Sequence, residues 1–360
     1  MISTEAVFDT PALVVDLDIM EANITRIAKA CRESGVQWRP HVKGLKIPEI
    51  ARKALAAGAI GITCAKLGEA EVMAAAGIRN ILIANQIVGP AKIARLITLL
   101  DSAKVIVAVD SIANIDALSE AASRSGRMLP TVIEVDIGMK RAGVAPGAPV
   151  VALANAIAAR PGLKLRGVTG WESHAIRIAD PTVKERTVAA AVGLLTSSAR
   201  ACHEIGHAVD IVSCGGTGTF PWCIRQPGVT EVQIGGGIFS DRVYRDEFHV
   251  DLPSALTVVA TVTSRPTATR IIVDAGKKVL SCDAVLPQPI GIPPFSSLLF
   301  SAEHATIELE SASAEPDIGE RIAFIVGSSD TTVNLHDEII ALRGGQAEAV
   351  WPVAARGKSR

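Results

Sequence analysis

The chain has 360 residues, nearly half of them hydrophobic and only 3% aromatic, with a formal net charge of −1. This length accommodates a barrel plus a smaller domain, and the balanced charge is not typical of nucleic-acid-binding proteins. Scattered cysteines without a CxxC pair, no apolar run of membrane-spanning length and no signal peptide together predict a cytoplasmic protein with no membrane partner.

From about residue 36 to residue 236, short β-branched runs alternate with helical stretches. Eight runs are candidate strands: Gln37–Val42, Ile60–Ala65, Asn80–Ala84, Val105–Val109, Thr131–Asp136, Leu165–Gly170, Asp210–Cys214 and Glu231–Gly235. The helical stretches include Pro48–Ala57, Leu67–Ala76, Ala91–Leu100 and Lys184–Ile205, and most stop at a glycine. Eight such units predict an α/β fold, a TIM-type (β/α)8 barrel. A doubly wound sheet is the alternative, but no Rossmann fingerprint follows the first strand.

The pattern changes after about residue 250, where strand-like runs alternate with Pro/Gly-rich loops such as Pro287–Pro294. The candidate strands there are Ala255–Ser264, Thr269–Asp274, His304–Glu310 and Arg321–Val326. This pattern predicts a C-terminal all-β domain, with which the early run Ala12–Asp16 is expected to pair. We therefore expect a barrel over residues 17–245 and a β-domain built from residues 1–16 and 246–360.

Lys43 follows the first predicted barrel strand, in the run Trp38-Arg39-Pro40-His41-Val42-Lys43. A lysine at that end of a barrel strand can point into the mouth of the barrel, where active sites of this fold lie. It can hold a carbonyl cofactor, pyridoxal phosphate (PLP), as a Schiff base. The alternatives are an ordinary solvated charge at Lys43, or the same role for Lys46 on the same loop.

Two glycine-rich runs follow the seventh and eighth predicted strands. They are Gly215-Gly216-Thr217-Gly218-Thr219 and Gly235-Gly236-Gly237. Glycines let the backbone approach an anion closely, and the loops after strands seven and eight of such barrels commonly hold a phosphate. A plain turn is the alternative for each run alone.

Two further residues stand after barrel strands. His174, in Gly170-Trp171-Glu172-Ser173-His174, is a candidate acid–base group, with a structural or solvated histidine as the alternative. Arg141 follows the fifth strand and either hydrogen-bonds a cofactor ring or pairs with a surface carboxylate. The HExxH pattern His203-Glu204-Ile205-Gly206-His207 is not a zinc site in this interpretation, because Gly206 should end the helix that the motif needs.

With these motifs in view, the chain resembles the D-threonine aldolase / D-serine dehydratase group of fold-type III PLP enzymes, relatives of alanine racemase. The resemblance covers nearly the whole length. The motifs that carry it are Thr10–Asp16, Arg39–Lys43, Ile60–Glu71, Gly215–Thr219, Glu231–Gln233 and Asp330–Leu335.

The resemblance implies a role for each matching residue. Lys43 matches the Schiff-base lysine, and His174 matches a histidine that acts as acid or base near the substrate hydroxyl. The implied cofactor-binding residues are His41, Arg141, Gly216, Thr217, Gly218, Gln233, Gly235 and Gly236. The resemblance further implies an amino-acid substrate and a homodimer with active sites near the interface.

The chain departs from the family pattern where a divalent metal (Mn or Mg) would bind. The metal motif carries a histidine two residues before an aspartate or cysteine, but here Ser328 takes the histidine position and only Asp330 remains. One carboxylate is a poor site for a divalent cation unless His304, His336 or Asp337 compensates. The family's threonine next to the lysine is Gly44 here, and its Gly-Ser-Tyr is the glycine run that starts at Gly235.

These observations favour retro-aldol cleavage of a D-3-hydroxy amino acid, D-threonine-like, to glycine and an aldehyde. The alternatives are a metal-independent PLP amino-acid racemase, a D-serine dehydratase-like lyase on a different or bulkier amino acid, and a non-catalytic PLP carrier. The predicted β-domain argues against a carrier of the single-barrel type.

Overall fold

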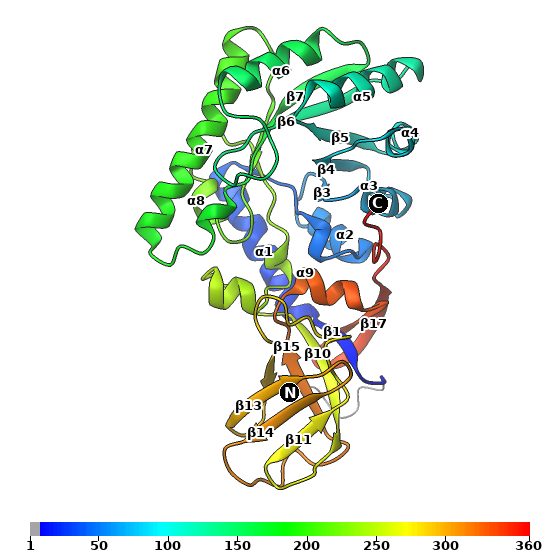
Figure 1. Cartoon of the computed structure of the whole chain (residues 1–360), viewed down its shortest axis with the longest axis vertical. Helices are drawn as coiled ribbons and strands as arrows, with labels where there is room; N and C mark the ends of the chain where they lie inside the picture. Colours follow the sequence, from blue (N-terminus) through cyan, green and yellow to red (C-terminus); the bar gives the residue numbers. More distant parts are fainter. Residues whose placement is uncertain (1–7) are drawn as a thin grey trace. The chain divides into compact units, whose positions relative to one another are not determined.

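The computed structural model describes residues 8–360, which divide into two compact units (Figure 1). One unit consists of residues 25–43, 48–235 and 357–360, and the other of residues 8–24, 44–47 and 236–356. The domain boundaries expected from the sequence, after residues 16 and 245, stay a prediction.

The first unit is an α/β barrel of eight parallel strands. They are β2 Gln37–Trp38, β3 Ile62–Cys64, β4 Asn80–Gln86, β5 Lys104–Val109, β6 Leu129–Glu134, β7 Leu163–Thr169, β8 Ile211–Cys214 and β9 Glu231–Val232. Their order in the sheet is β2-β9-β8-β7-β6-β5-β4-β3. Hydrogen bonds from the amides of Ile60 and Thr63 to the carbonyls of Trp38 and Pro40 link the two ends. The predicted barrel, with one strand in each predicted run, is confirmed.

One helix, α1, precedes the first barrel strand and the others follow barrel strands; Figure 1 shows α3 to α7 outside strands β3 to β7. The helices are α1 Leu17–Ser34, α2 Pro48–Ala56, α3 Leu67–Ala75, α4 Pro90–Leu99, α5 Ile112–Arg124, α6 Ala148–Ala158, α7 Pro181–Glu204 and the short α8 Phe220–Cys223. Inside the barrel, apolar side chains from four strands form one buried cluster: Leu82, Ile106, Ala108, Val132 and Ile211. This cluster is the core that holds the strand ends in place.

Helix α7 ends just before Gly206, as predicted from the sequence. It stops at Glu204, and Gly206 has a φ of 92°, a left-handed conformation that favours glycine after a helix. His203 therefore lies in the helix while His207 lies beyond it, with its Nε2 2.8 Å from Oδ1 of Asn155. The two histidines do not share a helical face.

The second unit is built on antiparallel strands. They are β10 Leu256–Ser264, β11 Arg270–Val273, β12 Gln288–Ile290, β13 Phe295–Phe300, β14 Ala305–Leu309, β15 Arg321–Ile325, β16 Glu338–Arg343 and β17 Gln346–Pro352. The early strand β1 (Ala12–Asp16) pairs antiparallel with β10 and parallel with β16, as expected for a strand that joins this domain. Alternate residues of β1 point into a cluster with Val259, Ile340 and Leu342.

The structure adds four strands to this domain that the sequence did not predict, namely β12, β13, β16 and β17. The run expected as a loop, Pro287–Pro294, contains β12, which pairs with β15 in spite of its central Pro289. Within residues 8–360, no helix has both the length and the apolar character needed to cross a membrane.

Candidate active site

Lys43 lies one turn beyond the first barrel strand. Strand β2 ends at Trp38, His41 forms a single bridge with Thr63, and Lys43 sits in a 3-10 turn, η1 (Val42–Gly44). The backbone amide of Lys43 donates to Nδ1 of His41 at 3.3 Å. His41 thus fixes the backbone that carries the lysine, and its expected part in binding a cofactor stays a prediction.

The side chain of Lys43 faces a tryptophan. Its Nζ lies 5.2 Å from the centroid of the Trp171 ring, and Cζ of Arg141 lies 5.4 Å from the same ring. Cations at this distance interact with the ring face. The structure therefore brings together two residues predicted from separate strands, Lys43 and Arg141, around Trp171.

Arg141 also faces a carboxylate. Its Nη2 lies 3.8 Å from Oε1 of Glu134, whose other oxygen accepts a 2.6 Å hydrogen bond from Nε2 of Gln86. Burial raises the pKa of Glu134, a shift that the Gln86 hydrogen bond and the Arg141 charge oppose. Arg141 remains more than half exposed, so its guanidinium is available to a bound ligand.

A buried carboxylate hydrogen-bonds to the first glycine loop, Gly215–Thr219. Glu172 is fully buried, and its Oε2 accepts a 3.2 Å hydrogen bond from the amide of Gly215. Its Oε1 accepts a short hydrogen bond from the hydroxyl of Thr219. Both ends of the loop are thereby tied to one side chain, with Gly215 in a left-handed conformation (φ 75°).

The loop between these anchors offers a donor. Gly218 is buried, and its amide has no acceptor among the residues that the structure describes. A buried amide without a partner is costly and is commonly satisfied by a ligand. Beside it, Gly216 packs against the tryptophan: a Cβ there would come within 3.0 Å of Nε1 of Trp171.

Gly235, the first residue of the second glycine run, packs against the segment that carries Lys43. A Cβ on Gly235 would overlap the carbonyl group of His41, so only glycine fits there. Gln233 donates to the hydroxyls of Ser213 at 2.9 Å and Thr169 at 3.2 Å. These bonds tie Gln233 to β8 and β7.

His174 lies in a different environment from Lys43. It belongs to the 3-10 turn η2 (Ser173–Ala175), its side chain is exposed, and its ring packs against the backbone of Gly138. With Arg186 and Leu194 of α7 it lines a groove of about 570 Å³. Its role as an acid or base stays a prediction.

The residues around Asp330 do not fit a divalent cation. Asp330 lies in the first turn of α9 (Ser329–Thr332), preceded by Ser328. Of residues 8–360, one group of three side chains with metal-ligating atoms lies close together, and it is Glu172, Cys214 and Cys223. The Asp330 carboxylate instead packs on Gly44, at the place where a side chain of residue 44 would start.

The three residues that could compensate have other positions or partners. Nε2 of His336 lies 2.8 Å from the carbonyl of Val279, and Asp337, which is largely exposed, pairs with Arg356. His304 is an exposed residue just before β14. The carboxylate near Asp330 is that of buried Asp241, and its two oxygens already accept hydrogen bonds from the amides of Tyr244 and Ser329. A hard cation needs several oxygen ligands at one point, and this arrangement does not supply them.

The Glu172 group is a hydrogen-bonded cluster rather than an ion site. Burial, followed by a hydrogen bond with Cys214, raises the pKa of Cys223 well above its ordinary value. Metal ligation requires a thiolate, and both Glu172 oxygens already accept hydrogen bonds from the loop.

Comparison with protein families decides the relationship. The model of the alanine racemase N-terminal domain matches residues 15–243. The chain belongs to this family. A second model, of a D-serine dehydratase-like domain, matches residues 255–342.

Relatives of this alanine racemase-like chain are similar over nearly the full length. A D-threonine aldolase of Arthrobacter sp. is 36% identical and covers 98% of this chain and 94% of its own. A 3-hydroxy-D-aspartate aldolase of Paracoccus denitrificans is 32% identical with the same coverage. The crystal structure of a D-threonine aldolase from Filomicrobium marinum superposes with a TM-score of 0.92 at 37% identity, covering 97% and 96% of the two chains. The resemblance inferred from the motifs and the expectation of a lyase are confirmed.

The residues present in this family member fit PLP. Lys43 offers the amine for the aldehyde, the buried Gly218 amide offers a donor for a phosphate oxygen, and Arg141 offers an exposed cation. Sequence reasoning missed Glu172, although it stands inside the segment Gly170–His174 that drew attention to His174. A glutamate between a tryptophan and a serine shows no sign in the sequence that it is buried against a loop more than forty residues later.

Proposed function

We propose that the protein is a PLP-dependent lyase that cleaves a D-3-hydroxy amino acid, D-threonine-like, to glycine and an aldehyde by a retro-aldol reaction. The observation that carries this proposal is Lys43 beside Trp171 and Arg141 at the C-terminal end of the barrel strands. The near-full-length similarity to two aldolases supports the choice of bond.

PLP bound through Lys43 supplies the electron sink for cleavage at the substrate α-carbon. The chain supplies attachment and orientation. Thr217 and Gly218 would hold the phosphate, in a loop whose shape Glu172 maintains. His41 orients the backbone of Lys43, and Arg141, which lies near the Trp171 ring, would bind the cofactor ring or the substrate carboxylate.

We assign the proton transfer at the substrate β-hydroxyl to a ring nitrogen of His174. Loss of that proton must accompany breakage of the Cα–Cβ bond, and histidine is the side chain best matched to this transfer near neutral pH. The exposed ring of His174, three residues from Trp171 on the segment that follows β7, supports the assignment.

The test is a product assay with PLP-loaded enzyme. D-threonine, D-allo-threonine and their L-enantiomers are each incubated, and glycine and acetaldehyde are quantified. We expect both products in equal amounts from a D-isomer only. Lys43→Ala should abolish turnover, whereas Lys46→Ala should retain it if the protein folds. Inertness of all four isomers would refute the aldolase assignment.

One observation favours a second candidate, a metal-independent amino-acid racemase. The donor set around Asp330 does not fit a divalent cation, which lyases use to stabilise a departing oxygen or alkoxide. A dehydratase would suffer most from this loss, because hydroxide leaves poorly without a Lewis acid. Deuterium from solvent entering Cα without cleavage would identify a racemase, and release of a keto acid would identify a dehydratase.

We further propose a cytoplasmic homodimer. All six cysteines have free thiols, which suits a reducing compartment. Light scattering coupled to gel filtration measures the mass directly, and a value near the 37.5 kDa of one chain would contradict the dimer.

A further inference from the structure

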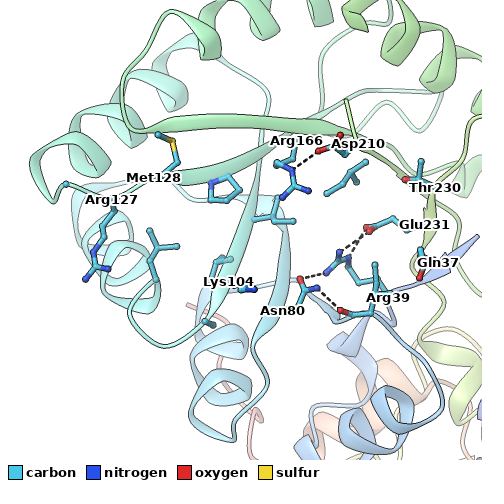
Figure 2. A pocket seen from close by; sticks show the side chains of 18 residues that line it. Gln37, Arg39, Asn80, Lys104, Arg127, Met128, Arg166, Asp210, Thr230 and Glu231 are labelled. Atoms are coloured by element: carbon cyan, nitrogen blue, oxygen red, sulfur yellow. Dashed lines mark hydrogen bonds and ion pairs between the residues drawn. The ribbon is translucent and has the colours of Figure 1, made fainter. Parts of the chain in front are cut away.

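A cavity of about 650 Å³ opens at the N-terminal ends of the barrel strands, the end opposite to Lys43 (Figure 2). Residues at or near the starts of seven strands line it, from Gln37 of β2 to Glu231 of β9. Its volume lies within the range of ligand-binding pockets.

Part of the polar lining is internally satisfied. Arg39 donates two hydrogen bonds of 2.9 Å to the two carboxylate oxygens of Glu231 and a third, also 2.9 Å, to Oδ1 of Asn80. The Arg39 and Glu231 side chains are each only 3% exposed. Their charges therefore compensate each other within the wall.

Two other cationic side chains of the lining have nitrogens that could still donate to a ligand. Arg166 engages only its Nε, at 3.3 Å from Asp210, and its two terminal nitrogens meet no acceptor in residues 8–360. Lys104, the first residue of β5, has no ion pair or side-chain hydrogen bond in the same part of the chain. Figure 2 shows Arg166 and Lys104 on two sides of the open space.

Apolar side chains also line the cavity. Ile106 and Ile211 belong to the buried cluster inside the barrel and also line the cavity. Met128, at the rim, is 56% exposed, which is high for so large an apolar side chain. Exposed apolar surface beside unneutralised cations matches a ligand with an apolar body and an anionic group.

We propose that this cavity is a second binding site, for a small organic carboxylate with an apolar body. The carboxylate binds the free edge of the Arg166 guanidinium, a geometry that suits two parallel hydrogen bonds, and Lys104 completes its charge. The apolar body packs on Ile106 and Met128.

Calorimetric titration of the PLP-loaded enzyme tests this site with three matched probes: 4-phenylbutyrate, 4-phenylbutanol and 4-phenylbutylamine. We expect the carboxylate to bind about tenfold or more tightly than the alcohol, and the amine not at all, because only the carboxylate pairs with the cations. Lys104→Met and Arg166→Met should each weaken the binding of the carboxylate about tenfold.

Lys164→Met is the control, since Lys164 is an exposed lysine near the start of β7 that does not line the cavity. It should leave the affinity unchanged. Equal affinity for carboxylate and alcohol, affinity unchanged by both test substitutions, or no heat up to about 10 mM carboxylate would each overturn the proposal. Binding that D-threonine displaces and that the two variants retain would place the probe at the catalytic end and overturn it as well.

Discussion

The carboxylate of Asp330 occupies the space in which a side chain on Gly44 would begin. Gly44 directly follows Lys43, so a residue from α9 is packed on the turn that carries the lysine. The threonine that the family places at this position could not coexist with Asp330 in this conformation. A side chain at residue 44 would therefore require the Asp330 carboxylate to move.

Gly44→Ala should destabilise the protein. The new methyl group must displace the Asp330 carboxylate, and overpacking of this kind typically costs about 1–3 kcal/mol of the free energy of unfolding. Urea denaturation measures this loss, and a double variant with Asp330→Ala should recover part of it. Gly193→Ala in α7 is the matched control, because a Cβ at Gly193 meets nothing within 4 Å. Equal stability of the Gly44 variant and this control would contradict the packing.

Chelation should leave the enzyme unchanged. Because Ser328 and Asp330 do not make a cation site, we expect no manganese or magnesium at stoichiometric level by plasma mass spectrometry. Activity and melting temperature should not respond to EDTA. A melting temperature raised by Mn²⁺ in the wild type would contradict this expectation. Ser328→His adds one potential ligand. A rise of the melting temperature with Mn²⁺ in that variant alone would show that the serine at this position prevents metal binding.

Sequence reasoning succeeded where the pattern is local and repeated. The strand and helix units that begin at Gln37 were predictable because each parallel strand is a short β-branched run. It failed for β16 and β17. Strand β16 pairs with β1 near the N-terminus, and β17 pairs with β16. At the candidate site, the position of Lys43 just after the first barrel strand could be predicted, and the structure has it there, in η1; its chemical role stays a prediction. The packing of Asp330 on Gly44 joins residues nearly three hundred positions apart, and no single sequence shows such a pair.

Glu172→Gln should weaken PLP binding. An amide in place of the carboxylate keeps the size of the side chain but turns one acceptor into a donor facing Thr219 or Gly215. We expect the loop to lose its shape and the dissociation constant for PLP to rise about tenfold, with about 1–3 kcal/mol lost in stability. Fluorescence titration of the apoenzyme measures the first quantity. Glu185→Gln, on the exposed face of α7, should change neither the dissociation constant nor the stability. If the Glu172 variant binds PLP as tightly as this control, Glu172 does not contribute to the cofactor site.

Thiol chemistry should single out one cysteine of the six. Five are buried, and Cys282 alone is partly exposed. Burial raises the pKa of Cys31 to about 12, so at about pH 8 only about one molecule in ten thousand carries its thiolate, the reactive form. Burial also raises the pKa of Cys282, so its reaction should be slow. Titration of the native protein with an aromatic disulfide reagent should therefore release about one equivalent slowly and six after unfolding. Cys282→Ala should abolish the one equivalent released by the native protein. A rapid reaction of the native protein that survives this substitution would show that a buried thiol, such as that of Cys214 or Cys223 next to the glycine loop, becomes accessible to solvent.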